Sequence, residues 1–266
     1  MRNSPQFALG LIAISWSLLA INHVFAQEYI KRDEKIVFFP TAAYLNPEKS
    51  HWHLPIHGWV FEPANSTARR KTIEFALSKK YGLKTTAESK PIFNDRINLL
   101  LADNERGKKV KILIAGEEHT LPPSAENGHF KGSLQLSVAK VEKAINNGVI
   151  DYQAILRRGD ERKFTGRVFV VQPKGVSVIS DIDDTIKVSN VLDRKQLMKH
   201  SFYLPFTAVE GMSEYYQALG KNTGASFHFV SSSPWHFFEP LRAFAMDNGF
   251  PPAEYHLKNF RFKDRT

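Results

Sequence analysis

Short apolar runs separated by turn-forming residues are the main pattern between residues 27 and 172. Such runs, flanked by turn signals at 103–107 and 126–128, are typical of β-strands. They predict strands at 36–39, 56–61, 97–101, 110–114, 130–136, 150–156 and 166–171. Seven short strands in succession predict an immunoglobulin-like β-sandwich.

One segment of this region departs from the strand pattern. Residues 68–81 carry apolar side chains at helical spacing and predict a helix. The segment is strongly basic, through Arg69, Arg70, Lys71, Lys79 and Lys80. A solvated charged face is the favoured interpretation, and a face toward anionic lipid is the alternative.

Beyond a linker at 172–175, the pattern changes to strands alternating with helices. The β-branched run 176–180 predicts a buried strand, and 225–230 and 255–257 predict two more. Helices are expected at 193–200, 212–219 and 240–247. Alternating strands and helices predict an α/β region with a parallel sheet. The expected divisions are therefore 1–26, 27–172 and 173–266.

Chemistry-bearing residues follow the first of these strands. Asp181 and Asp183 are two residues apart and Thr185 comes next. Side chains at the carboxyl end of a parallel strand lie where α/β sheets bind ligands. A nucleophilic aspartate, a second carboxylate for proton transfer and Mg²⁺ together make a phosphoryl-transfer site. The alternative is an acidic turn that caps the next helix.

The second strand ends in hydroxyl residues. Ser231 and Ser232 follow it directly, and Ser233 and Pro234 suit the cap and first turn of a helix. Hydroxyls and free backbone N–H groups at a helix start bind anions. A serine-capped helix without a ligand is the alternative. Lys187 is a candidate phosphate contact, with a solvated lysine as the equally weighted alternative.

The two motifs together resemble a known family. Asp-Ile-Asp-Asp-Thr-Ile-Lys at 181–187 and Phe-His-Phe-Val-Ser-Ser-Ser-Pro-Trp at 227–235 are similar to the actin-patch-type phosphatidate phosphatase catalytic domain, a lipin-like branch of the haloacid-dehalogenase (HAD) superfamily. Stretches at 38–42, 54–63, 103–107 and 127–130 resemble bacterial members. The resemblance implies a HAD-like catalytic domain that hydrolyses phosphatidate to diacylglycerol and phosphate.

The resemblance also implies roles for individual residues. Asp181 would be the nucleophile and Asp183 the general acid/base. Asp181 and the backbone carbonyl of Asp183 would bind Mg²⁺, Ser231 or less favourably Ser232 would bind a phosphoryl oxygen, and Thr185 would support the loop. HAD phosphatases also carry a later lysine and a Gly-Asp loop, neither of which is identifiable before Thr266. The expectation is therefore a C-terminally truncated and inactive chain, either a fragment or a degenerate gene product.

Composition and the N-terminus bear on location and partners. Arg2, the apolar run 7–21 and the small residues Val24 and Ala26 predict a cleaved secretory signal at 1–26, with an uncleaved anchor as the alternative. The chain is expected to be exported, to the periplasm or outside the cell, in a bacterium. A net charge of +9 favours anionic partners such as phospholipid. Without any nucleic-acid-binding motif, we expect no nucleic acid partner.

Two other functions remain open at this stage. The first is a non-catalytic lipid- or envelope-binding module with a degenerate HAD remnant. The second is a transition-metal site formed by His51, His53 and His57, which share one face of an extended segment. The neighbouring aromatics Trp52, Trp59 and Phe61 favour a packed core instead.

Overall fold

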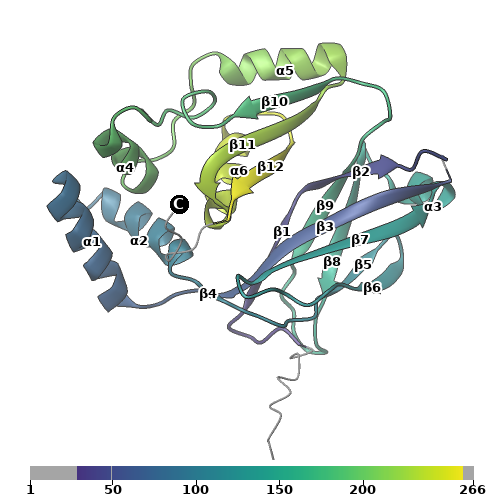
Figure 1. Ribbon diagram of the computed structural model, residues 1–266, viewed down its shortest axis with the longest axis horizontal. Coiled ribbons are helices and arrows are strands. Elements are labelled where there is room, and N and C mark those ends of the chain that lie inside the picture. The colour runs from purple at the N-terminus through teal and green to yellow at the C-terminus, as the bar shows by residue number, and fades with distance from the viewer. Residues whose placement is uncertain (1–28, 49, 260–266) are drawn as a thin grey trace, which may run out of the picture.

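The protein has a mixed α/β fold, which the computed structural model describes for residues 29–48 and 50–259 (Figure 1). The predicted signal at 1–26 lies outside the described residues. Within the described ranges, no helix is long and apolar enough to cross a membrane. Two sheets organise the chain, one on each side of the segment 171–176.

The first sheet has nine strands and contains most of the N-terminal region. Its order is β1-β3-β2-β9-β8-β5-β6, and β4 and β7 also pair with β3. The strands are β1 Lys35–Phe39, β2 Thr41–Leu45, β3 His51–Glu62, β4 Asp103–Asn104, β5 Lys111–Ile114, β6 Glu117–Thr120, β7 His129–Ser137, β8 Val149–Ile155 and β9 Thr165–Val170. The short helix α3, Val138–Ala144, follows β7.

Strand β3 is the hub of this sheet, because it pairs with four other strands. Alternate residues along it are buried, as expected for a strand with one face on a core. Gly58 permits the close pairing with β7, because a Cβ there would lie 2.2 Å from the Phe130 ring. Leu54 and Ile56 of β3 share one core with Ile112 of β5 and Val168 of β9. Strands β3, β5 and β9 therefore pack around a common interior. The aromatic residues Trp52, Trp59 and Phe61 of β3 are buried, as predicted.

The prediction of a strand at 97–101 was wrong, because most of this segment belongs to helix α2, Ser89–Leu100. Phe93, Ile97 and Leu101 are buried and four residues apart, which is helical spacing. Helix α1, Thr67–Tyr81, agrees with the predicted basic helix. It begins at the Ser66 cap and ends at Gly82, whose φ of 68° suits glycine.

The second sheet is parallel and has the order β10-β11-β12. Its strands are β10 Ser177–Asp181, β11 Ser226–Pro234 and β12 Ala253–Lys258. Helices α4 Arg194–Phe202, α5 Met212–Thr223 and α6 Phe238–Asp247 accompany them, with the 3₁₀ turn η1 Trp235–Phe237 before α6. The three helices and the third strand agree with the sequence prediction.

Two details of this region differ from the prediction. Strand β10 is not buried: among the described strands it pairs with β11 alone, and Ile179 is 76% exposed. Strand β11 continues through Ser233 to Pro234, so these residues do not start a helix. Pro234 instead has extended backbone and precedes η1. The helical segment therefore begins at Trp235, and the hydroxyl residues expected at its start belong to β11.

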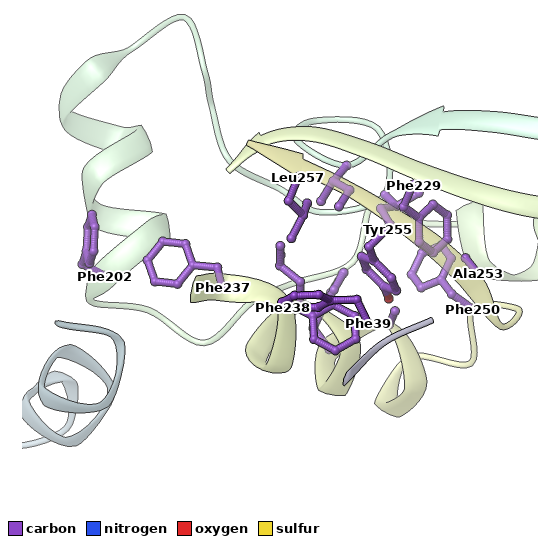
Figure 2. Packing of buried hydrophobic residues seen from close by; sticks show 14 of the residues in the cluster. Phe39, Phe202, Phe229, Phe237, Phe238, Phe250, Ala253, Tyr255 and Leu257 are labelled. Carbon is purple, nitrogen blue, oxygen red and sulfur yellow. The ribbon is translucent and has the colours of Figure 1, made fainter. Parts of the chain in front are cut away.

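A single apolar cluster joins the N-terminal region to the C-terminal region. Phe39 of β1 packs edge-on against Phe238 of α6, with ring centroids 5.0 Å apart. Figure 2 shows Phe39, Phe238 and Tyr255 gathered beneath β12, and Phe237 directed toward Phe202 of α4. The same cluster includes residues of α2. The two regions consequently share a hydrophobic core in addition to their chain connection.

Three histidines lie in the polar part of this junction. His57 Nε2 is 3.1 Å from His129 Nδ1, and His236 packs edge-on against Trp59. Burial lowers the pKa of His57 to about 3, with the positive charges of His129 and Lys131 adding to the effect. Burial likewise lowers the pKa of His129 and His236 to about 4 each. All three imidazoles are therefore neutral in the folded protein near neutral pH.

This junction predicts a steep loss of stability in mild acid. An unfolded histidine binds a proton near pH 6.5, whereas these three do not until about pH 4 or below, so the unfolded chain binds more protons in that window. Each of the three histidines contributes about 1.4 kcal/mol per pH unit to the free energy of unfolding, and this contribution is lost as the pH falls. Glu254 has the opposite effect and offsets the contribution of one histidine. Burial raises its pKa to about 7, so in this window the folded chain binds a proton at Glu254 that the unfolded chain lacks. Together, these three histidines and Glu254 should therefore lower the free energy of unfolding by about 3 kcal/mol for each unit that the pH falls near pH 5.5.

Urea unfolding followed across pH 5 to 7 measures this slope. His236→Leu removes one of the three groups and should reduce the slope by about 1.4 kcal/mol per pH unit. Equal slopes for the native chain and His236→Leu would contradict the assignment of His236 as a buried neutral imidazole.

Candidate active site

The two sequence motifs meet at the carboxyl ends of β10 and β11. Asp181 is opposite Val230 in the parallel register, and the Ile182 N–H donates to the Val230 carbonyl. Ser231 follows Val230 directly and is buried. The carboxylate and hydroxyl motifs, 48 residues apart from Asp183 to Ser231, therefore lie side by side at one sheet edge, where ligands bind in α/β sheets.

Asp183 is the most heavily bonded side chain of the site. Its Oδ1 lies 2.8 Å from Lys187 Nζ and accepts from the Ser189 hydroxyl at 2.7 Å. Its Oδ2 accepts from the Ser231 hydroxyl at 2.8 Å. Burial alone would raise the pKa of Asp183, but Lys187 and the hydroxyl donors outweigh burial and lower it. Asp183 is therefore present as a carboxylate that joins both motifs.

Asp184 fixes the turn that follows. Its backbone has a positive φ of 60°, and its carboxylate accepts from the N–H groups of Ser189, Asn190 and Val191, each at 2.7 Å. Burial favours a raised pKa here, but these three backbone donors lower it below its ordinary value. These three hydrogen bonds hold the loop 184–191 in one conformation, because the Asp184 carboxylate replaces the backbone partners that a strand or helix would provide.

Asp181, in contrast, has an exposed carboxylate. Within the described residues no cationic side chain forms an ion pair with it. Burial raises the pKa of Asp181, the carboxylates of Asp183 and Asp184 raise it further, and backbone hydrogen bonds only partly offset this. The preceding residue is anchored, because the Tyr216 hydroxyl donates to Ser180 Oγ at 2.9 Å. The result is a free carboxylate on a fixed backbone.

The other predicted site residues lie close by in different environments. Lys187 is buried and directed at Asp183. Thr185 is half-buried within the turn, and its N–H lies 3.4 Å from the Ile182 carbonyl. Ser232 is exposed and, by strand alternation, lies on the face opposite Ser231. Ser231 is thus the serine that reaches the carboxylate cluster, and its Oγ also accepts from the Ser233 N–H at 2.9 Å.

Arg96 of helix α2 supports the site from the N-terminal region, which the sequence did not reveal. Its Nη1 lies within 3.1 Å of the carbonyls of His200, Ser201 and Leu204, at the end of α4. Its guanidinium lies 3.7 Å from the centroid of the Phe206 ring. The Lys187 ammonium lies 5.0 Å from the same ring. Phe206 therefore contacts two cations and connects α2 to the partner of Asp183.

The three histidines of β3 are not gathered into one cluster. His51 and His53 have ring centroids 5.0 Å apart, whereas His57 contacts His129 and Trp235. Among the described residues, the group of three side chains that could hold a metal is a different one, on β11 and β12. The expected shared face is present, but the three-histidine site is not supported.

Parallel strands with carboxylates and a hydroxyl at their carboxyl ends define an α/β ligand-binding edge. Comparison with known proteins shows what this segment is similar to. Residues 176–266 match the family described as phosphatidate phosphatase APP1, catalytic domain. The match covers about a third of the chain, and the segment is similar to that catalytic-domain family.

Two curated yeast proteins are similar to the chain. The Saccharomyces cerevisiae protein named phosphatidate phosphatase APP1 is 34% identical over 93 residues, which is 34% of this chain and 16% of the relative. An uncharacterised protein of Schizosaccharomyces pombe is 32% identical over 103 residues, which is 37% of this chain and 17% of the relative. Each match thus spans less than a fifth of the relative's length.

The Arg96 contact predicts a measurable loss of stability. Arg96→Met leaves three partly buried carbonyls at the end of α4 without their donor, and should lower the free energy of unfolding by about 2–4 kcal/mol. Arg70→Met is the matched control, because Arg70 on α1 makes a partly exposed bond to Asn98 and should cost less than about 1 kcal/mol. Urea unfolding followed by tryptophan fluorescence measures both. Equal costs for the two variants would contradict this role for Arg96.

Proposed function

We propose that the protein is a Mg²⁺-dependent phosphatase that hydrolyses phosphatidate to diacylglycerol through an aspartyl-phosphate intermediate. The observation that carries the proposal is the contrast between two neighbouring carboxylates. Asp181 is free and exposed, while Asp183 is bound to Lys187, Ser189 and Ser231. One carboxylate is thus available to attack and the other is positioned for proton transfer. The family match of residues 176–266 supports the same reaction class.

The donor set at the sheet edge fits Mg²⁺. Three carboxylates, at positions 181, 183 and 184, lie near one ammonium group, that of Lys187. Burial and, to a smaller extent, the neighbouring carboxylates raise the pKa of Asp181, and a bound cation would oppose both effects. Oxygen donors of this kind suit Mg²⁺, and the Asp181 carboxylate and Asp183 carbonyl are the proposed ligands. When bound, the ion would neutralise charge on the phosphoryl oxygens.

The side chains then act in two steps. A carboxylate oxygen of Asp181 attacks phosphorus and the ester P–O bond breaks, while the Asp183 carboxylate takes the acidic proton of the bound phosphate monoanion and passes it to the leaving oxygen. Water next attacks the aspartyl phosphate at phosphorus, its proton passes to Asp183, and phosphate leaves with Asp181 restored. Asp183 gives that proton to the departing phosphate and returns to the carboxylate form that Lys187 and Ser189 favour. Ser231 is placed to bind a phosphoryl oxygen.

Two exposed apolar side chains beside the site are consistent with a substrate that lies in a membrane. Val191 is 42% exposed and Leu192 is fully exposed. The Val191 N–H donates to Asp184, so this apolar pair begins on the rigid turn of the site. Exposed apolar side chains of this kind gain free energy by entering a membrane interface. They would bring the sheet edge to the headgroup level of a membrane.

The proposal includes a HAD-like arrangement of the C-terminal region and an immunoglobulin-like arrangement of the N-terminal strands. The parallel order β10-β11-β12, with its carboxylates at the strand ends, supports the former. We also propose that the protein is exported through the signal at 1–26. The competing proposal is a non-catalytic module that binds anionic lipid through the exposed basic residues of α1.

Leu192→Asp tests the lipid proposal. The sequence led us to expect an inactive chain, but Asp181, Asp183 and Ser231 are assembled at one sheet edge. With Mg²⁺, we therefore expect the full chain to release phosphate from phosphatidate in anionic vesicles, and Asp181→Asn should abolish release. Leu192→Asp should reduce this release at least about tenfold, because a charge at the interface opposes membrane entry. Release from a soluble phosphomonoester should be unchanged.

Tyr215→Asp is the matched control, because Tyr215 is also exposed but lies on α5. A similar loss in both variants would reject Leu192 as the lipid contact. Vesicle sedimentation that survives Asp181→Asn and Mg²⁺ removal, with no turnover by the native chain, would favour the binding module instead.

A further inference from the structure

A second cluster of polar side chains lies on the exposed face of the parallel sheet. It consists of His228 on β11 and Glu254 and His256 on β12. His228 is opposite Glu254 in the register, and His256 is two residues further along β12, so all three project from the same face. The opposite face carries Phe227, Phe229 and Tyr255, which belong to the core.

The ligand-capable atoms of this cluster have the spacing of a metal site. His228 Nδ1 lies 3.6 Å from Glu254 Oε1 and 3.4 Å from His256 Nε2. All three atoms lie within 4.8 Å of one another. Bonds of 2.0–2.1 Å to a tetrahedral Zn²⁺ would separate two ligand atoms by about 3.3–3.4 Å. Only small side-chain adjustments therefore separate this arrangement from a coordinated one.

The charge balance of the cluster also favours a cation. The Glu254 side chain is only 14% exposed, and within the described part of the chain no lysine or arginine forms an ion pair with it. A desolvated carboxylate is costly unless it is paired with a cation or a metal. In addition, His228 Nδ1 and His256 Nε2 face each other at 3.4 Å. When the other nitrogen of each neutral ring carries the proton, both atoms present a lone pair to an ion between them.

The cluster is accessible and separate from the candidate active site. Glu254 lines a cleft of about 520 Å³ between the two sheets, which gives water a route to it. Asp181 lies two strands away, since Val230 is paired with Asp181 on one side and with His256 on the other. That separation is about 10 Å, too far for one ion to contact both sets of ligands.

We propose that His228 Nδ1, His256 Nε2 and Glu254 Oε1 form a binding site for one Zn²⁺-type transition-metal ion, with a fourth position open to water. Two imidazoles and a carboxylate select such metals over Mg²⁺, which prefers oxygen ligands. The bound ion would link β11 to β12.

The test is Zn²⁺ titration of the metal-free full chain by calorimetry, with Co²⁺ absorption as a probe of tetrahedral geometry. We expect one Zn²⁺ per chain, a tetrahedral Co²⁺ spectrum and a rise of Tm with Zn²⁺. His256→Ala should weaken binding at least about tenfold. His256 is exposed, so this variant should still fold, and Glu254→Gln provides a second variant of nearly equal volume.

Two variants serve as controls. Asp181→Asn removes a carboxylate of the candidate active site, and His53→Ala removes a histidine of β3; both should bind Zn²⁺ as the native chain does. The proposal is overturned if the native chain binds no stoichiometric Zn²⁺, or if His256→Ala and Glu254→Gln bind it unchanged. Loss of binding in His53→Ala alone would move the site to β3. None of these outcomes depends on phosphatase activity.

Discussion

The buried charge of Asp183 is the constraint on which the candidate active site depends. Its carboxylate joins segments 48 residues apart in the chain, through the Ser231 hydroxyl at one oxygen and Lys187 and Ser189 at the other. A partly buried carboxylate is stable only when such partners surround it. Satisfying this charge therefore fixes the β10 loop against β11 and leaves Asp181 as the free carboxylate at the edge.

The N-terminal region contributes to this geometry through packing. Trp235 and His236 come directly after the serine motif of β11, and they contact Phe39, His57 and Trp59 of the nine-stranded sheet. Arg96 reaches the end of α4 and, through Phe206, the side of Lys187. Figure 1 shows α2 close to α4. Phe39 of the nine-stranded sheet also packs against Phe238 of α6. The family match begins only at residue 176, yet residues outside it contact the site.

The sequence predicted the local elements where one periodicity dominates. Six of the seven strands proposed for the N-terminal region exist, and the motifs at Asp181 and Ser231 meet because parallel strands end at one edge. The segment 97–101 was misread because a short run with four apolar residues looks alike in a strand and at a helix end, although the spacing of Phe93 and Ile97 was informative. Pro234 was misplaced because its extended conformation depends on pairing with β12.

Other features depend on tertiary contacts that a sequence pattern does not contain. Nothing local connects Arg96 to Phe206, or His228 to Glu254, because each pair is formed by packing between separate elements. The exposure of Ile179 likewise reflects the place of β10 in the sheet and not its composition. The roles of Asp181, Asp183 and Mg²⁺ stay predictions until chemistry is measured.

Trapping the covalent intermediate tests the central claim most directly. The full chain is mixed with phosphatidate vesicles and Mg²⁺, quenched during turnover and reduced with borohydride, which converts an aspartyl phosphate to homoserine. Mass spectrometry of the tryptic peptide 175–187 then locates the change among its three aspartates. We predict homoserine at position 181, the free carboxylate. Homoserine at 183 or 184, or turnover without any reduced aspartate, would contradict the account.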